Sequence, residues 1–571
     1  MSQDTPLPKL YNVDDINSTF FFEFYVNGFE EQIDSFIEAL SKTNVKSDSD
    51  MEMSDFLKPL KDIMVRIVPP FTVVLENNYV DRVFRDSYYK YFSSSHFDTS
   101  RSSRRLSFFQ GTITSEEFFD TEKYTILDIQ ESQECCSSGK KIIVYYGSIV
   151  INPLMTGAIG RTIIDPRCLN LTVENDRADR EITPAYMRLS RFKAHVYGRS
   201  LTVSAFPYRM QDGETTRCAE ITILNLLDYY SNHYPEYRSA LPGEILDEEE
   251  RHSFERVLPS KGMSYAVMSK LMSNFGFYPR LYDLYSIEAF QSSCVTPIKK
   301  LKRWMYYYIE SGIPVAVELG TGKSKESGHS VICIGHGVMD KTQIGEAYKI
   351  SSKHGDGRTF INSADFYNSF VIIDDNEPIY NIREYEKLST HEELKLTTLA
   401  VPLNRRMCMD APDAEQSVLT ILNDDILGLD NWLNTISPGY LNDDEAIVMR
   451  LFLASSHSFK SYRVKTLPSI GAKELYAYVP MPRFVWVCEL YRLNAYLNSA
   501  EDDIYAFAEI VLDSTTVSTL GYPDKGLLLA HYPGVIATRY PDEVHIGFDN
   551  MATLKNDGPF KGFRNNLSLI R

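Results

Sequence analysis

The chain has 571 residues, more than one hydrophobic core usually holds, so two or three domains are expected. A hydrophobic content of 43% with 12% aromatic residues favours packed cores over disorder. The formal net charge of -18 argues against nucleic acid or an anionic membrane as a partner, because both require a basic protein surface.

Nothing in the sequence indicates export or membrane insertion. No apolar run is as long as a membrane-spanning helix. The segment Met1-Ser2-Gln3-Asp4 has no basic stretch leading into an apolar core, as a signal peptide would. The 8 cysteines follow no disulfide or metal-site spacing. We therefore expect a cytoplasmic protein with reduced thiols, no membrane span, no cofactor and no metal.

Residues 1–195 are expected to form an α+β region whose role the sequence does not indicate. Apolar residues at helical spacing predict a helix over Phe29–Leu40, and a second helix is expected over Val80–Phe92. Strands are predicted over residues 71–75, 142–151 and 160–164.

Residues 196–405 contain the segments with recognisable chemistry. A helix is predicted to begin at Cys218, with Thr215 or Thr216 as its N-cap. Two later helices are expected over residues 263–275 and 298–310, and strands over residues 313–319, 329–334 and 370–373.

Residues 406–571 are expected to form a further α+β region of unknown role. Strands are predicted over residues 483–491, 505–512 and 527–531. No internal repeat or low-complexity linker separates the three regions. The boundaries are therefore expected to be soft, and the oligomeric state is not predicted.

Cys218 is the candidate nucleophile. A thiol is mostly protonated at neutral pH, so an enzyme must lower its pKa. The free amide groups and the dipole of a helix N-terminus have that effect, and a neighbouring imidazolium has a stronger one. The structural alternative is a buried cysteine that fills a contact between a helix and a sheet.

His329 and Asp374 are the candidate base and orienting carboxylate. His329 opens a predicted apolar strand and would take the thiol proton, then return it to a leaving amine. Asp374 follows the strand Val371–Ile373 and would fix the imidazole tautomer. Asp375 is an alternative for that carboxylate. The structural alternative for both acids is an ordinary turn, because Asp and Asn favour turns.

Gln211 lies seven positions before Cys218 and is the candidate oxyanion donor. Its side-chain amide and the Cys218 backbone N–H would together bind the negative oxygen of a tetrahedral intermediate. A glutamine alone is a weak signal, so this assignment depends on its position before the nucleophile.

This pattern resembles the papain-like cysteine peptidases, and most closely the branch that contains the double-glycine leader peptidases of bacteriocin exporters. The likeness lies in Gln211 before a helix-capping Cys218, the Gly328-His329-Ser330-Val331 strand opening, Asp374 after a later strand, and the turn at residues 311–315. It covers about a third of the chain. It implies a central domain with a helical layer against an antiparallel sheet, and the catalytic roles given above.

Some features depart from the family pattern. The spacing from Gln211 to Cys218 is one residue longer than usual, and Ala219-Glu220 replaces the small residues common after the nucleophile. His329 and Asp374 are 45 residues apart, which implies an insertion such as Lys341–Asn368. The stretches around residues 147–153 and 160–162 also resemble bacterial proteins with this kind of central domain.

Three hypotheses follow for function. The first is a peptidase or amidase that acts on a peptide or protein through a Cys-His-Asp triad and a thioester acyl-enzyme. The second uses the same triad for acyl transfer or deamidation. The third is a binding or scaffold protein in which a papain-like fold has lost its activity. A metal hydrolase is a distant fourth, since His329 has no ligand partner within one helical turn.

Overall fold

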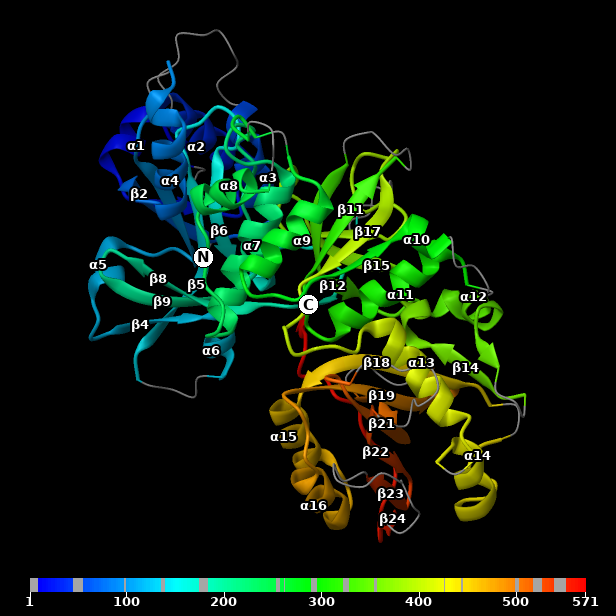
Figure 1. Ribbon diagram of the computed structural model, residues 1–571. Coiled ribbons are helices and arrows are strands. Elements are labelled where there is room, and N and C mark those ends of the chain that lie inside the picture. The colour runs from blue at the N-terminus through cyan, green and yellow to red at the C-terminus, as the bar shows by residue number, and fades with distance from the viewer. Residues whose placement is uncertain are drawn as a thin grey trace.

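The computed structural model describes residues 9–44, 55–96, 99–134, 139–173, 183–252, 257–260, 262–288, 295–321, 328–353, 357–425, 427–442, 445–498, 503–516, 526–538 and 551–571. This part of the chain is a mixed α+β structure with sheets of six, eight and eight strands and two smaller two-stranded sheets (Figure 1). The expected α+β class is therefore confirmed. Among the described residues, no helix combines the length and the apolarity needed to cross a membrane.

The first large sheet lies in the N-terminal third of the chain. Its strand order is β1 (Phe21–Phe24), β2 (Phe71–Tyr79), β3 (Ser103–Gln110), β5 (Lys141–Ile151) and β4 (Tyr124–Asp128), and β6 (Ile159–Ile164) pairs with β5. Neighbouring strands are antiparallel except for the parallel pair β4 and β5. The three strands predicted in this region are thus present as β2, β5 and β6.

Both faces of this sheet are covered. Helix α2 (Phe29–Asn44), predicted from its apolar spacing, buries Ile33, Phe36 and Leu40 in a core shared with the sheet. Most of the other predicted helix is present as α4 (Arg82–Lys90). The opposite face packs against the hairpin of β8 (Ser190–Val196) and β9 (Arg199–Ala205), which was not predicted.

The second large sheet positions the candidate site. Its strand order is β10 (Arg280–Asp283), β17 (Lys395–Val401), β11 (Val315–Gly320), β12 (His329–Gly337), β15 (Ser369–Ile373) and β16 (Asn381–Glu384). All these neighbours are antiparallel. Two short strands extend the sheet beside β12, namely β7 (Ala185–Met187) and β26 (Ser568–Ile570).

A helix lies against each face of this second sheet. Ile332 and Ile334 of β12 belong to the same core as α7 (Cys218–His233). Val331 and Cys333 belong to the core of α11 (Pro297–Glu310). Every residue of β12 is buried, which explains why its central residues, Val331 to Ile334, are apolar without alternation.

The third large sheet occupies the C-terminal part. Its order is β13 (Ser352–Lys353), β14 (Thr359–Asn362), β18 (Ile447–Ser455), β19 (Phe484–Arg492), β21 (Ala508–Asp513), β22 (Leu527–Tyr532), β23 (Val535–Thr538) and β24 (Met551–Thr553). The strand expected over residues 505–512 is divided into β20 (Tyr505–Ala506), which pairs elsewhere, and β21. Helices α15 (Ser456–Thr466) and α16 (Ile470–Tyr478) pack on one face (Figure 1).

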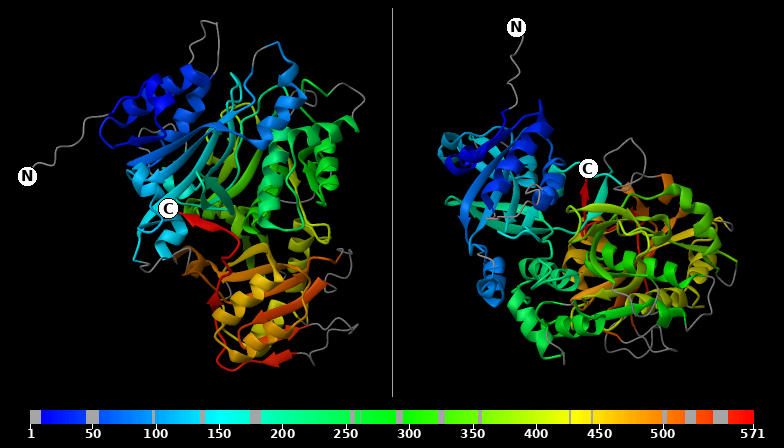
Figure 2. Two further views of the ribbon diagram at one scale, coloured as in Figure 1. Left: turned by 90° about the vertical axis from the view of Figure 1, so that its left-hand side faces the viewer. Right: turned by 90° about the horizontal axis from the view of Figure 1, so that it is seen from above.

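Strand pairing crosses the boundaries expected at residues 195 and 405. Residue 195 lies within β8, and β7 joins the central sheet. The expected insertion Lys341–Asn368 contains β14, which pairs in parallel with β18 of the third sheet. The chain finally returns through β26 to the central sheet, and this red strand lies between the N-terminal region and the orange strands of the third sheet (Figure 2). The division into three domains therefore stays a prediction, and the regions are interlocked.

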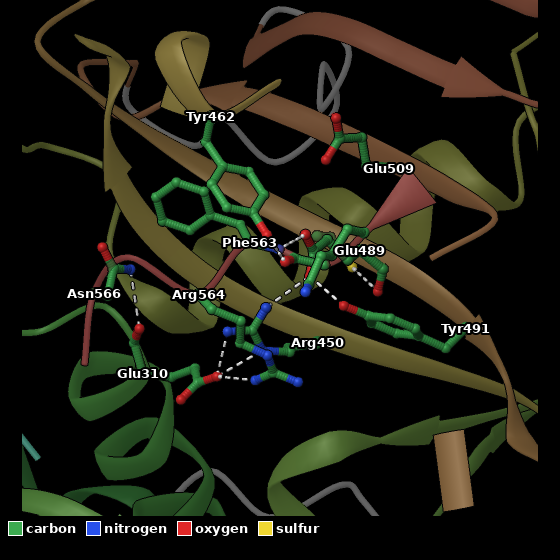
Figure 3. Close-up of polar contacts among 12 residues, drawn as sticks. Glu310, Arg450, Tyr462, Glu489, Tyr491, Glu509, Phe563, Arg564 and Asn566 are labelled. Carbon is green, nitrogen blue, oxygen red and sulfur yellow. Dashed lines mark hydrogen bonds and ion pairs between the residues drawn. The ribbon is translucent and has the colours of Figure 1, made fainter. Parts of the chain in front are cut away.

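A buried network of charges joins α11 to the third sheet (Figure 3). Arg450 of β18 contacts Glu310 of α11 and, at 2.7 Å, Glu489 of β19. Arg463 of α15 contacts Glu489 and, at 2.6 Å, Glu509 of β21. These five side chains are at most 3% exposed. Because each charge has an opposite partner, the network can tolerate its burial.

Candidate active site

Cys218 is the first residue of α7, as predicted, and its side chain is partly exposed. The N-cap residue is Arg217, in extended conformation, so the expectation of Thr215 or Thr216 as N-cap is wrong. The Arg217 N–H donates to the Glu220 carboxylate at 3.2 Å. The Cys218 N–H belongs to the first helical turn and has no acceptor within the helix.

Asp212 organises the loop before the nucleophile. Its Oδ1 accepts the backbone N–H groups of Glu214 at 2.9 Å, Thr215 at 2.7 Å and Thr216 at 2.9 Å. Thr215 Oγ1 donates to Asp212 Oδ2, and Thr216 Oγ1 accepts the Asp212 N–H at 3.3 Å, so both hydroxyls are engaged in this loop and neither caps the helix. Gly213 has φ +79°, a conformation that favours glycine. Sequence reasoning missed Asp212, although Asp-Gly is a strong turn signal.

His329 and Asp374 meet across neighbouring strands. His329 opens β12 and Asp374 directly follows β15, so antiparallel pairing brings the two positions together. His329 Nε2 lies 2.8 Å from Asp374 Oδ1. The two side chains are buried, with His329 8% and Asp374 1% exposed. Asp374, rather than Asp375, is therefore the carboxylate that hydrogen-bonds the imidazole.

The His329 imidazole also lies beside the Cys218 side chain. Burial alone would lower the pKa of His329, but hydrogen bonding to Asp374 and to Cys218 and the charges of Asp374 and Asp375 raise that pKa to about 11. Because Nε2 is bonded to Asp374, Nδ1 is the ring nitrogen left for the thiol. The structure thus brings the thiol, imidazole and carboxylate into one row.

Gln211 is linked to Asp374 through Asn376. Its Nε2 donates to Asn376 Oδ1 at 2.8 Å, and Asn376 Nδ2 lies 3.5 Å from His329 Nε2. The Asn376 N–H donates to Asp374 Oδ1 at 3.0 Å. Gln211 is thus linked to Asp374 through Asn376, and this contact uses one of the two hydrogens of its side-chain amide. Asn376 was recognised from sequence only as part of a turn.

Asp375 lies beside the imidazole without hydrogen-bonding to it. Its Oδ1 is 3.8 Å from His329 Nε2, and the residue is 4% exposed. Neither carboxylate oxygen has a hydrogen-bond partner among the described residues. Burial, opposed by the charge of His329 and reinforced by that of Asp374, raises the pKa of Asp375 to about 7.

Two contacts from the interior of α7 support the site. Glu220 accepts the Ser260 hydroxyl at 2.6 Å, and burial raises the pKa of Glu220. The hydroxyls of Thr222 and Ser330 lie 3.2 Å apart and join α7 to β12 one position after His329. The helix with the thiol and the strand with the imidazole are therefore held together below the site.

Among the described residues, one group of side chains could hold a metal ion. It consists of His329, Asp374 and Asp375, whose ligand atoms all lie within 4.8 Å of one another. An ionised carboxylate can only accept a hydrogen bond, so the bond to Asp374 places the hydrogen of His329 on Nε2. That hydrogen occupies the position a cation would take, so this arrangement fits a triad better than a metal centre.

A separate cavity lies at the opposite end of α7. It has a volume of about 330 Å³, and its lining includes Tyr230, His233 and Tyr234. A helix of 16 residues is about 24 Å long, so this cavity is remote from Cys218. It is not where a substrate would meet the thiol.

Comparison with known proteins does not assign the chain to a family. No protein-family model matches it, and no curated protein matches it. The functional argument therefore rests on the geometry of Cys218, His329 and Asp374.

Proposed function

We propose that the protein is a cysteine peptidase or amidase with a papain-like central domain. The observation that carries the proposal is the row of Cys218 at a helix start, His329 beside it, and Asp374 2.8 Å from the far nitrogen of that imidazole. Helix α7 packed against an antiparallel sheet supports the papain-like architecture. The free thiols of Cys168, Cys333 and Cys488 support a reducing, cytoplasmic location.

The proposed reaction proceeds through a thioester. The Cys218 sulfur, ionised beside the protonated His329, attacks the carbonyl carbon of an amide bond. The carbonyl oxygen becomes negative and is bound by the Cys218 N–H and the free amide hydrogen of Gln211. The C–N bond then breaks, and the nitrogen leaves with the proton of the imidazolium.

Hydrolysis completes the cycle. The neutral His329 takes a proton from water, and the resulting hydroxide attacks the thioester carbon. The carboxylic acid leaves, the sulfur regains its negative charge, and the imidazole is again protonated. Asp374 keeps its position throughout and holds the ring with Nδ1 toward the sulfur. Another amine in place of water would give acyl transfer, so the acceptor distinguishes hydrolysis, including deamidation, from transfer.

Replacement of Cys218 by alanine tests the proposal. The wild-type protein, incubated with a denatured protein digest, is expected to release new amino termini, and Cys218→Ala is expected to release none. The products are identified by mass spectrometry with water and glycine amide as competing acceptors. Amide products without free acids would indicate acyl transfer. A wild-type protein without either product, and with a Cys218 no more reactive than Cys408, would contradict the proposal.

Asp212 is expected to matter through the loop before the nucleophile. Asp212→Ala removes the acceptor of three amides, so we expect kcat/KM to fall about tenfold or more, because small displacements of catalytic groups are costly. Asp340→Ala is a matched control, since Asp340 accepts the amide of Thr342 at 2.9 Å in the insertion. Equal losses of activity in the two variants would contradict this role.

A further inference from the structure

The Asp375 carboxylate is a group the reaction above does not use. A buried carboxylate without a hydrogen-bond donor is unusual, because the loss of hydration is not compensated. His329 Nε2 lies 3.8 Å from Asp375 Oδ1, close enough for an ion pair. The electrostatic attraction between Asp375 and His329 therefore accounts for the buried position of Asp375.

We propose that Asp375 is a second carboxylate for the His329 imidazole, acting through its charge rather than through a hydrogen bond. Asp374 already takes the hydrogen of Nε2 and fixes the ring. Asp375 adds a second negative charge beside the same ring in a buried site, where screening by water is weak. That charge keeps the proton on His329, and hence leaves the Cys218 sulfur ionised. Asp375 thus acts through His329 and is a positioning residue. Its effect on catalysis rests on the proposed function.

Other groups around Asp375 oppose its ionisation. Asp374 follows the same strand, and Glu220 of α7 also acts on Asp375 through its charge. Tyr208 lies on a third side, where the charges of Asp375 and Asp374, after burial, raise the pKa of its phenol. His329 is the one cation among the groups that act on Asp375. The second charge is therefore present above about pH 7 and largely absent at pH 5.

The test compares Asp375→Asn with the wild-type protein by the rate at which iodoacetamide alkylates Cys218. Asparagine has the shape of a protonated aspartate, so the two rates should agree within about twofold at pH 5. At pH 8.5 the wild-type carboxylate is ionised, and the variant should react roughly three- to tenfold more slowly, because its proton returns from the imidazole to the sulfur. In Asp374→Asn, iodoacetamide should alkylate Cys218 more slowly than in the wild-type protein at both pH values.

Three outcomes would overturn the proposal. A ratio of the two alkylation rates that differs from one but does not change with pH would mean that Asp375 acts only in packing. Equal rates at both pH values would mean that its charge does not reach the imidazole. Micromolar binding of Zn²⁺ to the wild-type protein, lost in Asp375→Asn, would make the residue a metal ligand instead.

A stability measurement separates this inference from the proposed function. Burial raises the pKa of Asp375 in the folded protein to about 7, well above the ordinary value of about 3.9. Ionisation of Asp375 therefore opposes folding progressively from about pH 4 to pH 7. The unfolding equilibrium constant of Asp375→Asn, relative to wild type, should therefore fall by up to about 10³-fold between these pH values. This holds even if Cys218 catalyses nothing. A constant ratio would contradict a buried, ionised carboxylate.

Discussion

His329→Gln is expected to slow the alkylation of Cys218 by iodoacetamide at pH 6 by about 10- to 100-fold. In the proposed mechanism the His329 imidazole takes the thiol proton of Cys218, whereas an isolated thiol with a pKa near 8.5 is less than about 1% ionised at pH 6. Part of the advantage is offset, because a less basic thiolate is a weaker nucleophile. The rate is measured by mass spectrometry of the peptide that contains Cys218.

The pH range of this effect follows from the raised pKa of His329. A base whose pKa rises in the folded protein favours its protonated form, so the imidazolium is present from acidic pH until the pH approaches about 11. The wild-type alkylation rate should therefore rise by no more than about tenfold in total between pH 6 and pH 9, as Asp375 ionises, while that of His329→Gln should rise about tenfold per pH unit below its thiol pKa.

Two controls accompany this measurement. His195→Gln makes the same substitution on an exposed position of β8 and should leave the rate unchanged. Cys408 is also partly exposed and serves as a control thiol within the same protein, because its alkylation rate should be the same in every variant. A Cys218 rate that rises tenfold per pH unit in the wild-type protein as well would show that the thiol and the imidazole do not form an ion pair.

The second large effect is expected on stability. Arg463→Gln should lower the free energy of unfolding by about 3–5 kcal/mol, because it removes the arginine that pairs with the fully buried Glu509 and one of the two arginines that contact Glu489. Arg238→Gln is the matched control, since Arg238 makes an ion pair with Glu244 at 2.9 Å on an exposed surface. That substitution should cost less than about 1 kcal/mol. Urea denaturation of both variants provides the measurement.

Acid should weaken the same network. Burial opposes the ionisation of Glu310, but Arg450 and His336 hold the pKa of its carboxyl well below its ordinary range. A carboxyl with a lowered pKa stabilises the fold above its unfolded pKa, and this contribution is lost as the pH falls toward the folded value. Wild-type stability should therefore decline below about pH 4.3. Equal losses in Arg463→Gln and Arg238→Gln at neutral pH would show that the network is not essential.

Local physics explains which elements the sequence predicts well. The apolar spacing of α2 and the apolar run of β12 follow from which faces these elements bury, so both could be predicted. The hairpin of β8 and β9 was missed although its burial alternates strictly along β8, because its alternating side chains include serine and alanine beside charged residues. The pairing of β14 with β18 could not be predicted, since nothing near β14 specifies a partner 85 or more residues away.

For the site, the sequence by itself determined the kinds of residue and their local setting: Cys218 at a helix start, His329 opening a strand, and Asp374 closing another. These depend on spacing within a few residues, which sequence periodicity records. Only the tertiary structure decided that Asp374 bonds the ring while Asp375 does not, that Asn376 links Gln211 to Asp374, and that Asp212 holds the preceding loop. The reason is geometric, because the direction of a side chain at a strand end depends on the register between strands distant in sequence.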